Sequence, residues 1–225
     1  MSSRPDRRWC NATTHLDRFA LVTFAVDADA LARALPPRFT PDLEDGRAFV
    51  SAVPFLDRAF HFRVAPYPRL SCGQVNHRAY VVDEDGTTGV WFFGTSLDSR
   101  LVLVPRRLWR MPWHGERVRV AMDRTGYRAE VDGDFGGLVL DLVRTSAPLT
   151  GAPARFVDPF IGWYPRLGGG VGRYTVWHPP LELQRADPVD VHVDLHERLG
   201  LQPDFAWAGV CETTTFDVHT PPTKA

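Results

Sequence analysis

The sequence feature that most constrains the fold is a pair of β-rich runs joined by a short acidic turn. The runs cover residues 74–82 and 87–96, and the turn between them is Asp83-Glu-Asp-Gly86. An Asp/Gly turn between two runs rich in β-branched and aromatic residues predicts a β-hairpin, because glycine and aspartate tolerate the backbone conformation of a tight turn. This hairpin is the element around which the other predictions are arranged.

Polar residues recur along the first of these runs. By the two-residue period of a strand, Asn76, Arg78 and Tyr80 share one face, and His77 and Ala79 share the other. Two interpretations of the first face remain open. Either it is exposed to water, or it lines a polar site inside the fold.

Further β-rich runs and turns recur about every eight to twelve residues, a pattern typical of an antiparallel meander. They predict strands over residues 18–26, 47–55, 59–64, 117–122, 127–131, 138–143, 173–177 and 205–218. A loop is predicted over residues 67–73. Short helices are predicted over residues 28–35 (after the N-cap Asp27), 98–109 and 154–163. The fold class predicted is mostly β, of α+β type, with a few short helices.

Residues 188–199 carry two conflicting patterns. The Asp187-Pro188 pair and Gly200 are suitable ends for a helix, so we predict a helix over 188–199. A strand is the alternative, because Val189, Val191 and Val193 alternate with polar residues.

The size and charge of the chain narrow its class. A length of 225 residues is enough for one domain with a proper core, and we expect residues 1–225 to form it, with residues 1–8 and 220–225 flexible. The formal net charge of −1 gives no argument for binding nucleic acid or an anionic membrane. The sequence has no apolar run of about 18 residues and no signal-peptide pattern, which favours a cytoplasmic protein. A homo-oligomer remains open.

The cysteine and lysine content of the chain argues against disulfides, thiolate metal sites and Schiff-base chemistry. Cys10, Cys72 and Cys211 are widely separated and odd in number, which argues against a disulfide framework and a thiolate metal site. The only lysine is Lys224. A Schiff base is therefore excluded unless the C-terminal segment supplies the amine.

No metal site or serine nucleophile is predicted. His192 and His196 would share one face of a helix, but Val193 stands where a zinc protease has glutamate, so we interpret them as solvated histidines. The chain has no Gly-x-Ser-x-Gly motif. We expect neither a metal nor another cofactor.

Arginines and aromatic residues are concentrated in residues 74–114. Arginine among aromatic rings suits the recognition of a carboxylate or enolate in an apolar pocket. The alternative is that the rings form core while the arginines extend to solvent. The candidate ligand-binding residues in this segment are Asn76, Tyr80, Trp91, Phe93, Arg100 and Trp113.

Several motifs together resemble the YqjF-like family of uncharacterised bacterial proteins. They are Leu35-Pro-Pro-Arg38, Asp45-Gly-Arg47, Asn76-His-Arg-Ala-Tyr-Val81, Gly89-Val-Trp-Phe-Phe93, Ser96-Leu-Asp-Ser-Arg100 and His178-Pro-Pro180. That family is grouped with acetoacetate decarboxylase. The resemblance implies a cone-like antiparallel β-barrel with helices packed outside and a pocket inside.

The resemblance also implies a change of chemistry. The decarboxylase motif Gly-Arg-Glu-Ile-Trp-Gly-Tyr-Pro-Lys-Lys, which carries the Schiff-base lysine, aligns without gaps with residues 105–114. Arg106, Trp109 and Pro112 match, but the two lysines become Trp113 and His114. Without an amine the pocket cannot form an imine.

Two functions follow from this resemblance. The first is a cofactor-independent enzyme (a cyclase, dehydratase, isomerase or non-imine lyase) acting on a keto- or carboxylate-bearing, polyketide-like small molecule. In it Arg78 and Arg100 hold an anionic oxygen, and His114 transfers the proton. The second is a protein on the same fold that binds a small ligand, or has a structural role, without catalysis.

Overall fold

In the computed structural model, residues 9, 11–99 and 103–225 are described, without the side chains of residues 68, 104, 105, 220, 221 and 224. This part of the chain contains thirteen strands and four short helices. The strands are β1 (Ala12–Val26), β2 (Phe39–Pro41), β3 (Ala48–Phe62), β4 (Ala65–Asp83), β5 (Thr88–Leu97), β6 (Trp113–Gly115), β7 (Arg117–Met122), β8 (Gly126–Asp132), β9 (Leu138–Pro148), β10 (Ile161–Pro165), β11 (Val171–Trp177), β12 (Gln184–Val193) and β13 (Asp204–Lys224). The helices are α1 (Ala28–Ala34), α2 (Leu103–Leu108), α3 (Ala154–Val157) and α4 (Asp194–Arg198). The prediction of a mostly β fold is confirmed.

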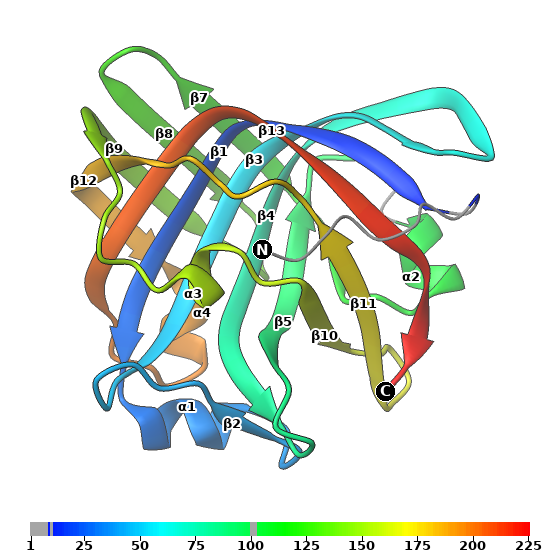
Figure 1. The fold of residues 1–225 in the computed structure, drawn as a ribbon, viewed down its shortest axis with the longest axis horizontal. Helices are drawn as coiled ribbons and strands as arrows, with labels where there is room; N and C mark the ends of the chain where they lie inside the picture. The colour runs from blue at the N-terminus through cyan, green and yellow to red at the C-terminus, as the bar shows by residue number, and fades with distance from the viewer. Residues whose placement is uncertain (1–8, 10, 100–102) are drawn as a thin grey trace.

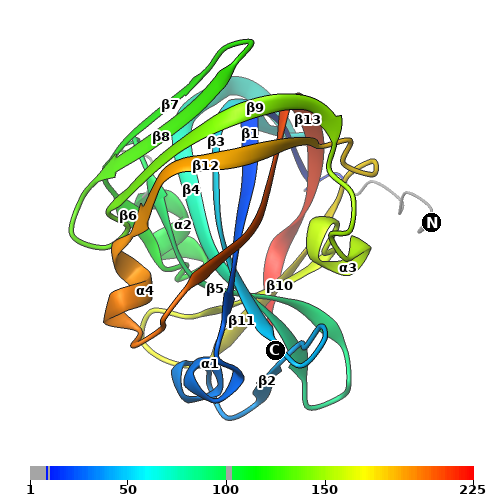
Figure 2. The same cartoon turned by 90° about the vertical axis from the view of Figure 1, so that its left-hand side faces the viewer.

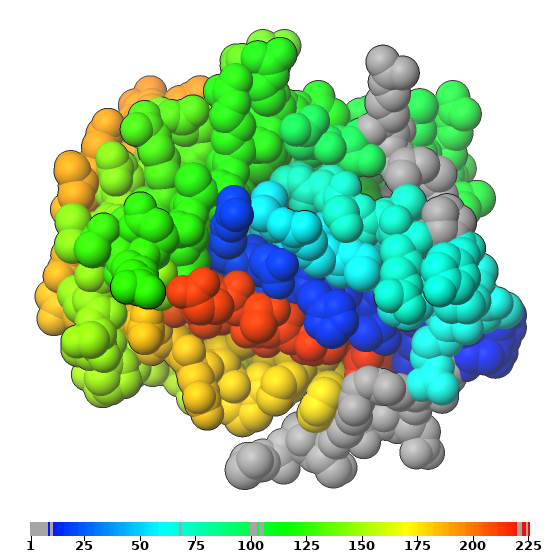
Figure 3. All heavy atoms as spheres, turned by 90° about the horizontal axis from the view of Figure 1, so that it is seen from above, coloured from blue at the N-terminus to red at the C-terminus, as the bar shows by residue number. Residues whose placement is uncertain are grey.

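Seven strands close into a ring. They pair in the order β1-β3-β4-β5-β10-β11-β13, and β13 pairs back to β1 (Figure 1). Within the ring only β5 and β10 are parallel. The closing pair is long, from Ala12 opposite Val218 to Ala25 opposite Asp204, and β1 lies between β3 and β13 on the molecular surface (Figure 3).

A second layer covers one side of the ring. From β13 the sheet continues through β12, β9, β8 and β7, which fold across β1, β3 and β4 (Figure 2). The side chains between these layers form the largest core, which we call the interlayer core. It includes Val22, Ala52, Ala79, Leu140 and Val210.

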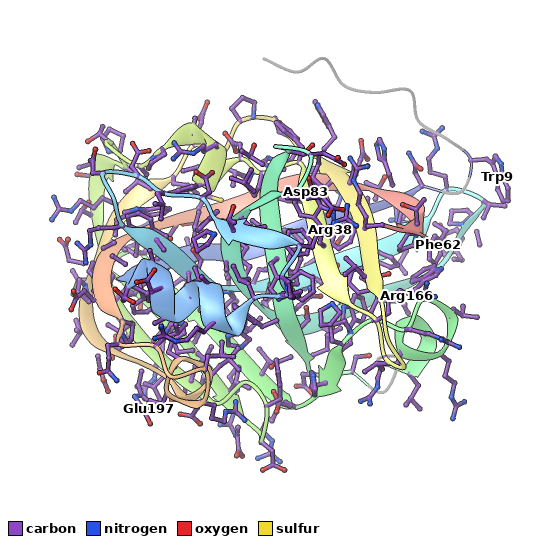
Figure 4. All side chains as sticks on the ribbon, turned by 90° about the horizontal axis from the view of Figure 1, so that it is seen from below. Trp9, Arg38, Phe62, Asp83, Arg166 and Glu197 are labelled. Carbon is purple, nitrogen blue, oxygen red and sulfur yellow. The ribbon has the colours of Figure 1, made fainter. Side chains whose placement is uncertain are left out.

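The central hairpin forms as predicted. In its turn the Asp83 carboxylate accepts the N–H of Asp85 at 2.8 Å, and Gly86 adopts a φ of 79°. Arg38, which follows α1, forms an ion pair with Asp83 (Nη2 to Oδ2, 3.0 Å; Figure 4). The start of α1 is also confirmed, because the Asp27 side chain accepts the N–H of Ala30.

The helix predicted over residues 188–199 is wrong for its first half. Residues up to Val193 belong to β12, which pairs with β9, and only Asp194–Arg198 form a helix. The alternation of valines was the correct signal, because pairing with β9 satisfies the backbone groups that a helix would have satisfied internally.

Other boundaries also differ from the predictions. Residues 67–73 are not a loop but part of β4, and the strands predicted over 47–55 and 59–64 are one strand, β3. The helix predicted over 154–163 ends at Val157, and α2 covers only residues 103–108 of the predicted 98–109, of which residues 100–102 lie outside the described part. Among the described residues, no helix has the length and apolar character needed to cross a membrane.

Candidate functional site

A cavity lies inside the ring. Its lining includes side chains from all seven ring strands. Its volume is about 140 Å³, which is room for on the order of ten water-sized spheres, or a ligand of roughly ten non-hydrogen atoms. Most of the wall is apolar and aromatic, and six of its polar residues are Thr14, Asp57, Gln74, Asn76, Arg78 and His178.

Strand alternation in β4 explains why polar groups enter this cavity. Gln74, Asn76 and Arg78 line it, whereas Val75 and Ala79 lie in the interlayer core. The predicted polar face of β4 therefore faces the inside of the ring. Of the two interpretations that the sequence left open, exposure to water is wrong, because this face of β4 turns towards the inside of the fold.

Arg78 is held in place by two neighbours. Its Nη2 donates to the carbonyl oxygen of Phe156 at 3.2 Å and to the hydroxyl of Tyr80 at 3.3 Å. Its Nε–H is buried and has no hydrogen-bond partner among the described residues. That nitrogen is closed to a ligand, but the side chain of Arg78 lines the cavity, and the rest of its guanidinium can donate to an acceptor of a ligand.

A histidine and an aspartate lie together in the same region. The Nδ1 of His178 lies 2.9 Å from the carbonyl oxygen of Pro179 and 3.6 Å from the carboxylate of Asp158. With the proton on Nδ1 donated to that carbonyl, Nε2 is an acceptor. Burial lowers the pKa of His178 below its ordinary value, and the charge of Arg78 acts in the same direction. Burial raises the pKa of Asp158.

The carboxylate of Asp57, on β3, lines the cavity itself. Burial raises the pKa of Asp57 to about 6, although the hydrogen bond that the Thr14 hydroxyl donates to it acts in the opposite direction. Two amides lie between Asp57 and Arg78 along the cavity wall. The oxygen of Asn76 accepts from Gln74 Nε2 and from the Thr95 hydroxyl, each at 3.0 Å.

Some of the predicted site residues line the cavity, and others lie away from it. Asn76, Arg78 and Trp113 line the cavity. Tyr80 is buried beside it, stacked on Phe156 at 4.3 Å, and its hydroxyl also bonds to Ser51 at 2.7 Å.

The remaining predicted residues lie elsewhere. Trp91 is part of the interlayer core, and Phe93 packs against that core. Arg100 lies outside the described residues. His114 is not in the cavity wall, because its ring stacks on Phe135 with 3.8 Å between centroids.

His114 belongs to a second polar cluster, on the face of β4 opposite to Arg78. There the Ser96 hydroxyl donates to Glu116 at 2.5 Å, and Glu116 also accepts the N–H groups of Phe135 and Gly136. His77 lies next to this cluster, 2 % exposed, with no partner for either ring nitrogen among the described residues. Burial lowers the pKa of His77 to about 3. In the described part of the chain, no group of three potential ligand side chains could hold a metal ion.

Sequence reasoning did not identify His178, Asp158 and Asp57 as site residues. His178 appeared only within the His178-Pro-Pro180 motif, and Asp57 lay between two predicted strands. No local spacing joins Asp57 to His178, because the two come to line one cavity only when the ring closes.

Comparison with known proteins gives the family and the fold. A family model described as an uncharacterized conserved protein, DUF2071, matches residues 13–214. No curated protein sequence matches the chain.

Solved structures match over nearly the whole chain. An acetoacetate decarboxylase-like enzyme from Sphingomonas wittichii RW1 matches with a TM-score of 0.69 and 11% identity, over 97% of this chain and 94% of that one. The enduracididine biosynthesis enzyme MppR, complexed with pyruvate, matches with a TM-score of 0.66 and 13% identity, over 100% and 91%. Acetoacetate decarboxylase from Legionella pneumophila matches with a TM-score of 0.65 and 12% identity, over 99% and 92%. At such low identity these matches show a shared fold and no more.

Proposed function

The chain belongs to the DUF2071 family of uncharacterized conserved proteins, and we propose that it is a cofactor-independent enzyme acting on a small keto- or carboxylate-bearing molecule. The ring of strands would then serve as the cone-like barrel implied by the family resemblance, with the substrate inside. The observation that carries this proposal is Arg78, whose guanidinium-bearing side chain lines a cavity with mainly apolar walls. In such a setting a charge-assisted hydrogen bond to a carboxylate or enolate is stronger than in water.

His178 is the proposed base. The sequence pointed to His114 for the proton transfer. We assign the proton transfer to His178 instead, because His178 lines the cavity and His114 does not. Its lowered pKa keeps the ring neutral at pH 7, so Nε2 is free to take a proton. The Pro179 carbonyl fixes the tautomer, and Asp158 stabilises the imidazolium that forms.

The proposed first step is proton removal from the carbon next to a carbonyl group. The C–H bond breaks, its proton goes to His178 Nε2, and its electron pair forms the enolate, whose oxygen Arg78 holds. Return of the proton to another atom would give an isomerisation, and loss of a β-substituent would give a dehydration or lyase step. Ring closure of a polyketide-like substrate starts from the same enolate.

An imine is not part of this proposal. The only lysine of the chain is Lys224, in β13, and its side chain lies outside what the structure describes. A Lys224→Arg variant keeps the charge and removes the primary amine. It should retain full activity, and loss of activity in this variant would favour imine chemistry.

Ligand binding is tested by thermal stability against keto acids, β-diketones and aromatic carboxylates. A ligand at a hundred times its Kd adds about 2.7 kcal/mol and raises the Tm by a few degrees. The stabilisation should be lost in Arg78→Ala and kept in Arg124→Ala, whose arginine is exposed in the β7–β8 turn. Equal stabilisation of both variants would contradict the role of Arg78.

Catalysis is tested by the exchange of keto-acid α-protons with D2O, followed by NMR. His178→Gln should slow protein-catalysed exchange by about a hundredfold or more, the usual contribution of a general base. The same variant should still bind the acid. Binding without any exchange by the wild-type protein would favour the second function, a non-catalytic ligand-binding protein, which the mainly apolar wall of the cavity also suits.

A further inference from the structure

The cavity has two polar ends that do not touch. Arg78 pairs with Ser51 of β3, whereas Asp57 of β3 pairs with Cys72 of β4. The register of β3 and β4 is unbroken between these positions. Cys72 and Arg78 are therefore six residues apart on extended strand, which corresponds to about 20 Å of backbone.

The electrostatics agree with this separation. The pKa of Asp57 depends on its burial and on the Thr14 hydroxyl, with no contribution from Arg78. Arg78 acts instead on Asp158, His178 and Tyr174. The guanidinium and the Asp57 carboxyl thus belong to two distinct polar regions of one cavity.

Between the two regions the wall is apolar on β1 and β3, where Leu16, Phe19, Phe55 and Val53 line the cavity. On β4 the wall carries the amides of Gln74 and Asn76, which bond to each other. A short keto acid bound at Arg78 leaves Asp57 without a partner from the ligand. A ligand that satisfies both ends must carry its polar groups on either side of an apolar middle part.

We propose that the ligand is an elongated monoacid with a hydroxyl group at its far end, and that Asp57 is the residue that recognises this hydroxyl. This inference rests on the proposed function, since it takes Arg78 as the site of the acid group. An extended chain of about fifteen non-hydrogen atoms, with a hydrogen bond at each end, spans the distance between the two regions, and its size is of the order of the cavity volume. Asp57 accepts the ligand O–H when ionised and donates its own proton when neutral, and Thr14 holds the carboxyl in position.

The test compares two fatty acids that differ only at the far end. Dodecanoate and ω-hydroxydodecanoate are titrated into the full-length protein by calorimetry. The wild-type protein should bind the hydroxy acid about tenfold more tightly, because the hydroxyl gains a hydrogen bond to a charged group. Asp57→Ala should bind both acids equally, while Asp190→Ala, which removes an exposed carboxylate of β12, should keep the preference.

Asp57→Leu is the second variant, in case Asp57→Ala does not fold. It fills the space of the carboxyl with an apolar group, and it should also lose the preference. The difference between the two ligands, measured with and without Asp57, isolates the contact between the carboxyl and the hydroxyl.

The outcomes separate this inference from the proposed function. Equal affinities in the wild-type protein, or a preference that survives in the Asp57 variants, would overturn the role of Asp57 but not that of Arg78. If neither acid binds, this inference fails, and the keto-acid panel decides the proposed function separately. If Arg78→Ala binds both acids as well as the wild type, the role of Arg78 fails and this inference fails with it.

Discussion

Trp113 and His114 are neighbours in β6, and their side chains lie on opposite faces of the sheet. Trp113 pairs with Thr95 and lines the cavity, whereas His114 pairs with Ser96 and stacks on Phe135. A one-residue step in a strand thus separates a ring that lines the cavity from a ring that packs on the other face of the sheet.

This arrangement predicts different effects for the two substitutions. Trp113→Ala should weaken acid binding about fivefold, since an aromatic contact contributes about 1 kcal/mol. His114→Ala should leave the Kd unchanged and lower the free energy of unfolding by about 1 kcal/mol through the lost stacking. Calorimetric titration and urea unfolding measure the two effects. Weaker acid binding by His114→Ala would mean that His114 does contribute to the binding site.

Tyr80 is expected to position Arg78 rather than to touch the ligand. Tyr80→Phe removes the hydroxyl that Arg78 Nη2 contacts at 3.3 Å, but the Phe156 carbonyl still holds the guanidinium. We expect about a fivefold loss of acid affinity, corresponding to about 1 kcal/mol for one hydrogen bond. Tyr67→Phe, at an exposed tyrosine, is the control. A loss as large as that of Arg78→Ala would mean that the hydroxyl contacts the ligand directly.

Gly136 is a position where a side chain cannot be accommodated. A Cβ there would lie 2.0 Å from the Ser96 hydroxyl and 2.9 Å from His77 Nε2. Gly136→Ala should therefore cost about 1–3 kcal/mol of stability, as overpacking does. The matched control is Gly126→Ala, whose Cβ would meet only ordinary contacts at 3.8 Å or more. Urea unfolding measures the stability of both variants. Equal stabilities would show that the side chains of Ser96 and Glu116 can move to make room for the added methyl group.

Acid should destabilise the protein through its buried histidines. Burial lowers the pKa of His77 to about 3 and that of His196 to about 4, whereas an unfolded histidine titrates near 6.5. Between these values the unfolded chain binds more protons. The contribution of these neutral histidines to the free energy of unfolding is therefore fully present above about pH 6.5. It is lost progressively as the pH falls towards 3. Asp57, whose pKa is raised to about 6, has an opposite and smaller effect on stability between about pH 6 and pH 4.

A His77→Leu variant isolates this effect. Its unfolding free energy should change less between pH 7 and pH 5 than that of the wild type, because one titrating group is gone. His15→Leu, at an exposed histidine, should keep the wild-type slope. Parallel slopes in wild type and His77→Leu would show that His77 is not the group that binds the proton.

Local signals predicted the hairpin well. The Asp83–Gly86 turn and the alternation along β4 depend on neighbours in sequence, so they placed Asn76 and Arg78 on one face correctly. Where two local signals disagreed, as at residues 188–193, pairing with a distant strand decided the outcome. The same competition turned residues 67–73 into strand, because the β3–β4 pairing continues to Ala65.

The cavity itself could be predicted only in part. Asp57, Arg78 and His178 come from distant parts of the sequence, and each of them looks like an ordinary polar residue in its own segment. The two-residue period could not separate Trp113 from His114 without knowing that β6 exists and pairs with β5. The fold-family resemblance supplied the idea of a pocket, and ring closure determined which side chains enter it.

The pairing of β1 with β13 has a consequence for how the chain reaches this state. The two strands that close the ring come from opposite ends of the sequence, so their contacts have nearly the largest sequence separation the chain allows. Contacts of this kind form late and make folding slow. During synthesis, the edge of β1 that pairs with β13 stays unpaired until β13 has left the ribosome. For that period this edge can pair with a wrong strand. Of the described strands, the latest to be made is therefore the one that completes the cavity wall.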